Sequence, residues 1–200
     1  MRNTNGNSKP LKINKIMYKL LLIISGWKVD KNTPEEYKRC VLIGAPHTSN
    51  WDLFYAILLL KTLKVPFKFT IKKQWFRFPF NLIIGTLGGI PINTKKKEKI
   101  GNVKIMADFF KKNKEFAMAI TPEGTRSLRE NWKSGFYHLA KDSNLPICFG
   151  YLDYRTKIAG IGGPIFPSED KYSDMKKIME FYDTKKPKFP EKFSLDKRFI

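Results

Sequence analysis

The chain has 200 residues, enough for one domain with a hydrophobic core, and its 42% content of hydrophobic residues excludes an intrinsically disordered protein. Its 38 Lys and Arg residues against 18 Asp and Glu residues give a net charge of +20, which calls for a polyanionic partner. Nucleic acid and an anionic membrane surface both meet that requirement.

Residues 11–27 carry apolar side chains at helical spacing, with lysines mainly on the opposite face. The apolar part is far shorter than the roughly 20 residues that a transmembrane helix needs, and residues 25–28 make a poor signal-peptide cleavage site. The pattern predicts either a helix in the membrane interface, with Trp27 at its boundary, or an amphipathic helix packed on the domain. We therefore divide the chain into a tail with an interface helix (1–29), a central domain (30–184) and a basic C-terminal tail (185–200) that we expect to pack poorly.

The apolar run 40–44 predicts a buried strand, and the apolar segment 53–63 predicts a buried helix. Between them lies a turn with His47, and Asp52 follows His47 after four residues that include three good N-cap residues. A carboxylate bonded to one imidazole nitrogen fixes the tautomer and leaves the other nitrogen free to take a proton. The pair is therefore either a general base with its orienting carboxylate or an ordinary helix-capping arrangement. Because the chain holds only two histidines, we favour the base.

Further strands and helices follow along the chain. Residues 67–72 alternate as a strand does, and the aromatic and basic residues of 74–84 suggest a membrane-dipping surface, the wall of a lipid tunnel, or core packing. The later predicted elements are, in order, a strand at 88–92 after a glycine turn, a helix at 98–113, strands at 115–120 and 145–152 separated by a helix at 135–141, a strand at 157–161 that ends before Gly162-Gly163-Pro164, and a helix at 168–182.

The two cysteines, Cys40 and Cys148, both lie in apolar, strand-like runs, so we expect small buried core residues in a reducing compartment. No Cys/His cluster has zinc spacing, and no glycine-rich run matches a nucleotide-binding pattern. We therefore expect neither a metal nor a cofactor.

The strand at 115–120 leads into a turn, residues 121–127, with a proline, a glycine and an arginine. Gly124 permits close backbone approach and Arg126 offers a bidentate fork for phosphate, so the turn is a candidate anion cradle, although alone it would be an ordinary surface loop. Ligands of open α/β sheets gather at the carboxyl ends of strands. We therefore expect this turn and the His47 turn at one edge of a sheet.

These motifs resemble, in the same order, those of the glycerolipid acyltransferases, above all the 1-acylglycerol-3-phosphate acyltransferases. The spacing of His47 and Asp52 is similar to the family's signature. The further similar blocks are Lys72-Lys73 with Pro79, Gly88-Gly89-Ile90-Pro91-Ile92, Pro122-Glu123-Gly124-Thr125-Arg126-Ser127, Lys133 with Gly135, Ala140 and Leu145-Pro146-Ile147, and Gly163-Pro164-Ile165. The likeness therefore covers roughly residues 41–166. It departs at Asn93-Thr94, where the family usually has an aspartate and an arginine.

The resemblance implies an α/β fold, a single domain with a mixed sheet flanked by helices, preceded by the N-terminal amphipathic helix. It implies an O-acyltransferase of phospholipid biosynthesis that moves a fatty acyl group from acyl-CoA or acyl carrier protein to the hydroxyl of a lysophospholipid-like acceptor. His47 would be the general base and Asp52 would orient it and balance its charge. The residues that the resemblance assigns to substrate binding are Lys72, Gly89, Pro91, Glu123, Gly124, Thr125 and Arg126, and Lys95 is added to them as a substitute for the missing arginine.

The same resemblance implies a peripheral or monotopic protein on the cytoplasmic face of an anionic membrane. Donors for the tetrahedral oxyanion would be backbone amides of the turns or Lys72. Because of Asn93-Thr94, another hydroxylated or aminated lipid is an alternative acceptor, with Lys95 as the nearest substitute cation. A basic nucleic-acid-binding module is a second alternative, although the chain has no such motif, and a catalytically idle lipid binder is a third.

Overall fold

The structure is a computed structural model, and it describes residues 15–77, 80–92 and 99–200. Its strands are β1 (Lys28–Val29), β2 (Arg39–Gly44), β3 (Phe67–Lys72), β4 (Gly89–Ile92), β5 (Phe116–Ile120), β6 (Ile147–Asp153) and β7 (Ile158–Ile165). Its α-helices are α1 (Lys15–Ile24), α2 (Asn50–Thr62), α3 (Phe80–Thr86), α4 (Lys99–Lys112), α5 (Gly135–Asp142) and α6 (Lys171–Asp183). Short 3-10 helices lie at Glu35–Lys38, Lys73–Trp75 and Pro190–Lys192.

The strands form one seven-stranded sheet in the order β1-β7-β6-β2-β5-β3-β4. Neighbouring strands are parallel except for β6 and β7, which are antiparallel, so the expected mixed sheet is confirmed. Strand β7 is longer than the strand predicted at 157–161, because it continues through Gly162-Gly163-Pro164 to Ile165. The register shifts between Ile147, which pairs with Ile165, and Phe149, which pairs with Gly162; Gly163 in this stretch has φ +95°, so the strand contains a bulge there.

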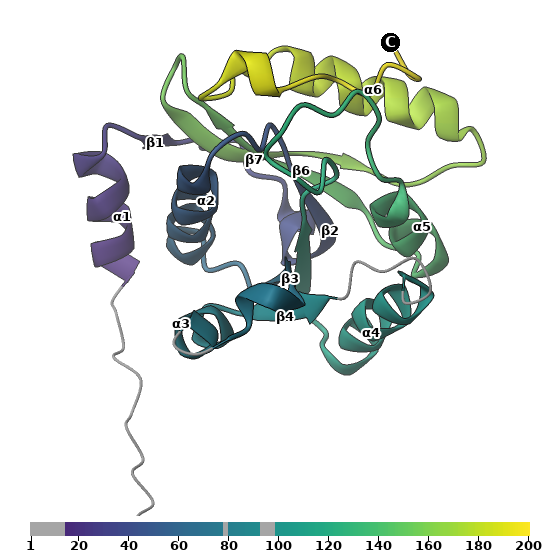
Figure 1. Cartoon of the computed structure of the whole chain (residues 1–200), viewed down its shortest axis with the longest axis horizontal. Coiled ribbons are helices and arrows are strands. Elements are labelled where there is room, and N and C mark those ends of the chain that lie inside the picture. The colour runs from purple at the N-terminus through teal and green to yellow at the C-terminus, as the bar shows by residue number, and fades with distance from the viewer. Residues whose placement is uncertain (1–14, 78–79, 93–98) are drawn as a thin grey trace, which may run out of the picture.

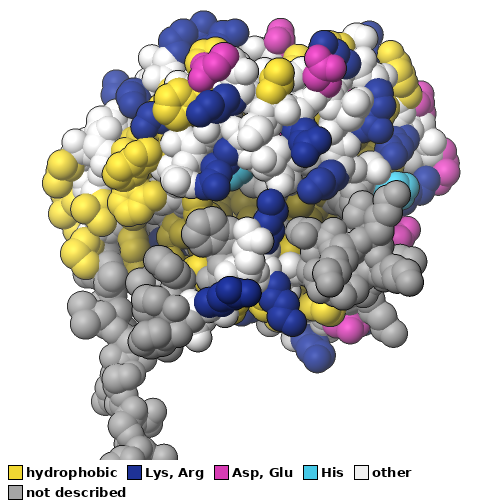
Figure 2. All heavy atoms as spheres, viewed as in Figure 1, with side chains coloured by type: hydrophobic (Ala, Val, Ile, Leu, Met, Phe, Trp, Pro, Cys, Tyr) yellow, Lys and Arg dark blue, Asp and Glu magenta, His cyan; other side chains and the backbone are white. Residues whose placement is uncertain are grey.

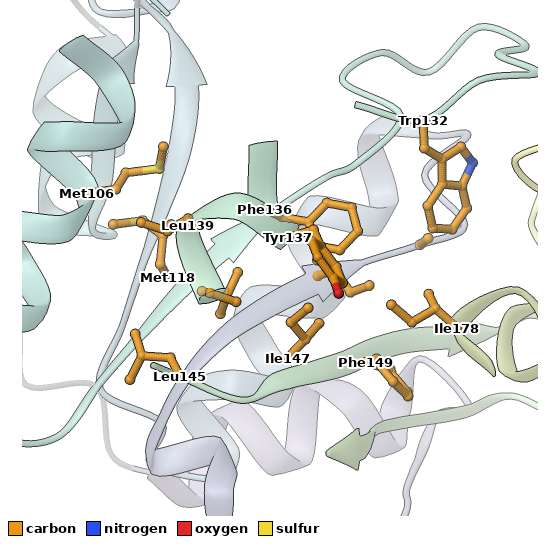
Figure 3. Packing of buried hydrophobic residues seen from close by; sticks show 14 of the residues in the cluster. Met106, Met118, Trp132, Phe136, Tyr137, Leu139, Leu145, Ile147, Phe149 and Ile178 are labelled. Atoms are coloured by element: carbon orange, nitrogen blue, oxygen red, sulfur yellow. The ribbon is translucent and has the colours of Figure 1, made fainter. Parts of the chain in front are cut away.

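Alternate residues of the central strand β2 face opposite sides of the sheet, as the continuous apolar run predicts for a strand covered on both faces. Val41 and Ile43 pack in a cluster with residues of α4, α5 and α6, part of which Figure 3 shows. Cys40 and Leu42 pack on the other side with residues of α2 and β3. Helices thus cover both faces (Figure 1), and Cys40 and Cys148 are free and buried, as expected.

Helix α1 packs on the domain through part of its surface. Leu22 and Trp27 are fully buried in a cluster with Leu58 and Leu59 of α2, and β1 then pairs with β7. Residues 11–14 of the expected helix lie outside the described residues. Among the helices that the structure describes, none is both long and apolar enough to cross a bilayer.

The C-terminal segment, residues 185–200, is packed against the domain, so the expectation of a poorly packed tail is wrong. Trp132 donates hydrogen bonds from its backbone N–H to Asp196 (3.0 Å) and from its indole to the Ser194 carbonyl (3.0 Å). Asp196 is fully buried. Burial alone would raise the pKa of Asp196, but hydrogen bonds from Arg198 and Trp132 hold that pKa below its usual value. The C-terminal segment is basic and contains prolines, yet it contributes a buried, hydrogen-bonded carboxylate, that of Asp196, to the domain.

Candidate active site

Two loops meet at the carboxyl edge of the sheet, as the sequence predicts. The loop from Ala45 to Ser49 leaves the central strand β2, and the turn beginning at Thr121 leaves its parallel neighbour β5, with Ile43 paired to Ile120. Because parallel strands end at the same edge, the imidazole of His47 and the turn that carries Arg126 border one cavity.

Asp52 serves the helix and the histidine together, so the two interpretations of this carboxylate are not exclusive. Its Oδ2 accepts hydrogen bonds from the backbone N–H groups of Thr48 and Ser49 (2.8 Å each), which makes it half of a capping box at the start of α2. The same oxygen lies 3.4 Å from Nδ1 of His47. The helix cap therefore fixes a buried carboxylate beside the imidazole.

The distance from Nδ1 to Oδ2 is longer than a usual N–H···O hydrogen bond, although it is within the range of an ion pair. Such contacts in unliganded sites often shorten when substrate binds. The His47 side chain is 20% exposed, and its Nε2 has no hydrogen-bond partner within the described residues. The arrangement suits a base that takes a proton at Nε2 while a carboxylate faces Nδ1.

Tyr154 is a site residue that sequence reasoning missed. Its hydroxyl donates a 2.7 Å hydrogen bond to Oδ1 of Asp52, from a position just after β6. Burial, followed by the contact with Asp52, raises the pKa of Tyr154 far above its usual value, so it remains a donor. No local pattern links residues 102 positions apart, and a tyrosine at a strand end has no signal of its own.

Glu123 lies beneath the His47 loop and not in the cavity where the resemblance put it. It is only 2% exposed, and its Oε1 accepts a 2.8 Å hydrogen bond from the backbone N–H of His47. Burial, together with the nearby charge of Asp52, raises the pKa of Glu123 to about 8, and the bond from His47 opposes the rise only in part. Glu123 therefore ties the turn after β5 to the backbone of the loop after β2.

Replacing Glu123 with glutamine should flatten the pH dependence of stability. Between pH 4.5, the usual pKa, and about 8, the folded parent holds a proton that the unfolded chain lacks, so its stability falls as pH rises through this window. Glutamine keeps an acceptor for His47 N–H but never ionises. In urea unfolding at several pH values, the free energy of unfolding of the parent should therefore fall relative to that of Glu123→Gln as pH rises. If the two free energies change in parallel with pH, the assignment is wrong.

The cavity at this edge has a volume of about 440 Å³. Most of its wall is apolar and comes from α2, β3 and the ends of the central strands; typical lining residues are Leu53, Ala56, Ile57, Leu60, Phe67 and Phe69. Polar groups come from the two loops and from the end of β3. The predicted site residues that line it are His47, Asp52, Lys72, Gly124, Thr125 and Arg126.

Other predicted substrate ligands lie elsewhere. Gly89 is in β4, where an added Cβ would meet Ile84 of α3 at 2.4 Å, so this glycine permits close helix packing. Pro91 is exposed on the same strand and does not line the cavity. Lys95, like Asn93-Thr94 and Pro79, lies outside the described residues.

Gly124 has φ +67°, a conformation that favours glycine, so the turn around it needs this residue.

Comparisons with known proteins identify the family and the fold. Residues 28–149 match the model of a family described as Acyltransferase. The structure resembles the crystal structure of the 1-acyl-sn-glycerophosphate (LPA) acyltransferase PlsC from Thermotoga maritima with a TM-score of 0.51 and 18% sequence identity. The match covers 87% of this chain and 80% of that chain. No curated protein sequence matches the chain significantly.

Proposed function

The chain belongs to the acyltransferase family, and from this premise we propose that it moves a fatty acyl group from acyl-CoA or acyl carrier protein to the hydroxyl of a lysophospholipid-like acceptor. One observation carries the proposal: His47 and Asp52 line a cavity whose walls are mostly apolar. A volume of about 440 Å³ is within the usual range of small-molecule sites and suits an acyl chain.

The reaction follows from where the imidazole lies. With the acyl chain in the apolar part of the cavity, the thioester carbonyl lies near His47. Nε2 takes the proton of the acceptor hydroxyl as that oxygen attacks the carbonyl carbon, and Asp52 balances the imidazolium. The tetrahedral intermediate then collapses, the carbon–sulfur bond breaks, and the thiolate receives the proton from His47. Lys72 lines the same cavity and is a candidate donor to the oxyanion, beside the backbone amides of the turns.

The test is acyl transfer from labelled acyl-CoA and acyl carrier protein to a panel of lysolipids, with the products identified by mass. The panel should contain 1-acylglycerol-3-phosphate, phosphate-free monoacylglycerol and aminated lysolipids, because Asn93-Thr94 departs from the family's second block. Product on any lysolipid supports the reaction class, and the preferred acceptor decides between the lysophospholipid and the alternatives. Absence of product with every donor and acceptor would overturn the proposal.

We also propose that an exposed apolar patch beside the cavity docks on an anionic membrane, on its cytoplasmic face. The apolar patch consists of residues Ile16, Met17, Leu20, Leu21, Ile23 and Ile24 of α1 with Trp51, Leu53 and Phe54 of α2. Figure 2 shows hydrophobic side chains gathered on the side of the molecule where Figure 1 places α1, and Lys and Arg side chains scattered over the centre and top of the same view. Leu53 also lines the cavity, so a docked patch would bring lipid to its mouth.

Introducing charge into the patch should release the protein from vesicles. Ile24 is 81% exposed and Leu20 49% exposed, so Leu20→Glu/Ile24→Glu should fold normally while losing apolar contact and adding charge that anionic lipid repels. We expect vesicle partitioning to fall at least about tenfold. Ile105→Glu/Phe166→Glu, at exposed apolar residues outside the patch, is the matched control. Equal sedimentation of the two variants with anionic vesicles would leave α1 a purely structural element.

A further inference from the structure

A second cavity lies beside the catalytic loop, and the C-terminal segment forms one of its walls. The segment is held there by hydrogen bonds: the N–H of Phe189 donates to Thr48 Oγ1 (3.3 Å), and the N–H of Tyr154 donates to the Lys186 carbonyl (2.8 Å). The cavity has a volume of about 520 Å³. Residues 188–192 thus face the loop that carries His47, from more than 130 positions away in the chain.

Three cations line this cavity: Arg126 from the turn after β5, and Lys188 and Lys192 from the C-terminal segment. One carboxylate, Glu191, also lines it. Within residues 15–77, 80–92 and 99–200, none of these four side chains belongs to an ion pair. Like charges that share a concave surface repel one another, and an anion bound between them would remove that repulsion.

Aromatic rings hold the two lysines at the wall. Nζ of Lys188 lies 5.6 Å from the ring centroids of both Trp51 and Phe189, and Nζ of Lys192 lies 4.4 Å from that of Phe189. The ring of Phe189 thus contacts both ammonium groups, and its backbone N–H is hydrogen-bonded to Thr48 of the His47 loop. Cation–π contacts of this kind restrict the conformations of long side chains. These side chains therefore lose less conformational entropy when a ligand binds.

The second cavity adjoins the apolar one, because Asn50 and Arg126 line both. His47 lines the apolar cavity, and the next two residues, Thr48 and Ser49, line the second one. A single substrate, or two substrates that meet at His47, can therefore place an apolar chain in one cavity and an anionic group in the other. Phosphate is the group that suits three cations, with a fork from arginine and point charges from the lysines.

We propose that the C-terminal segment completes a phosphate-binding site, in which Lys188 and Lys192 act with Arg126 on a phosphate of one of the two substrates. The inference rests on the proposed function, because it assumes that the adjacent cavity holds the acyl chain. The phosphate is either that of a phosphorylated acceptor or one of those of coenzyme A or the phosphopantetheine arm. Either source requires the same chemistry, and the experiment separates them.

The experiment measures equilibrium binding without turnover, by calorimetry. The probes are coenzyme A, pantetheine, a short-chain 1-acylglycerol-3-phosphate and the corresponding monoacylglycerol, so each phosphate-bearing probe has a phosphate-free partner. The variant is Lys188→Ala/Lys192→Ala. The control is Lys176→Ala/Lys186→Ala, which removes two exposed lysines that do not line the cavity, one of them from the same segment.

We expect the variant to bind one phosphate-bearing probe about 10- to 100-fold more weakly, with its phosphate-free partner and the control unchanged. A loss of affinity for 1-acylglycerol-3-phosphate assigns the site to the acceptor, and a loss of affinity for coenzyme A assigns it to the acyl donor. Lys188→Arg/Lys192→Arg should restore most of the affinity. Unchanged binding of both phosphate probes, or equal losses with and without phosphate, would overturn the inference. If the parent binds phosphate probes through these lysines but transfers no acyl group, the proposed function fails and the site stands.

Discussion

Replacing His47 with alanine should reduce acyl transfer by about 10²- to 10⁴-fold or more, because the substitution removes the group that takes the acceptor's proton. The fold should remain, since the imidazole is partly exposed and the bond to Glu123 comes from the His47 backbone, which alanine keeps. The measurement is the single-turnover rate with saturating acyl donor and acceptor, together with the thermal unfolding midpoint. A large loss of rate at an unchanged midpoint is the expected result.

The chain offers a matched control for this substitution in its other histidine. His138 lies on α5, exposed, and its ring contacts Tyr137 and does not line either cavity. His138→Ala should transfer acyl groups at the parental rate. Added imidazole should partly restore the rate of His47→Ala, because the side chain leaves a space beside the cavity and the missing function is proton transfer. A folded His47→Ala protein that works at the parental rate would remove His47 from the mechanism.

The parts of the site that were predictable from sequence are local. Ser49 and Asp52 are close in the chain, and the capping box that they form at the start of α2 follows from their spacing. The meeting of the His47 loop and the Arg126 turn was predictable because each follows a buried strand, and parallel strands end at one edge. Neither inference needed knowledge of distant contacts.

The parts that sequence reasoning missed depend on distant pairings. Tyr154 reaches Asp52 across 102 positions, and Phe189 reaches Thr48 across 141. Lys188 was predicted to belong to a poorly packed tail, because a content of lysine and proline does not tell whether a segment packs on the domain. Glu123 was predicted to bind substrate for a related reason, since the position of a residue in a motif does not tell which way its side chain points. In the structure the Glu123 carboxylate is buried and accepts a hydrogen bond from the His47 backbone.

Replacing Asp52 with asparagine should lower the rate of acyl transfer by about 10²-fold or more while the helix cap survives. The N–H groups of Thr48 and Ser49 both point at Oδ2, so the amide oxygen, and not the amide nitrogen, should take that place in the variant. An oxygen then still faces Nδ1 of His47, and the tautomer is kept. The variant loses the negative charge that stabilises the imidazolium as the proton arrives.

Two measurements separate the effect of the Asp52 charge from the effect of the position of its side chain. NMR of the His47 ring nitrogens should show the same neutral tautomer in Asp52→Asn as in the parent. Tyr154→Phe keeps the Asp52 charge and removes one hydrogen bond to it, so its loss of rate should be clearly smaller than that of Asp52→Asn. If Asp52→Asn instead switches the tautomer, the amide has turned its nitrogen toward the imidazole against two backbone donors, and the cap does not control the orientation of residue 52. If Tyr154→Phe costs as much as Asp52→Asn, the placement of the carboxylate limits the rate, and its charge is secondary.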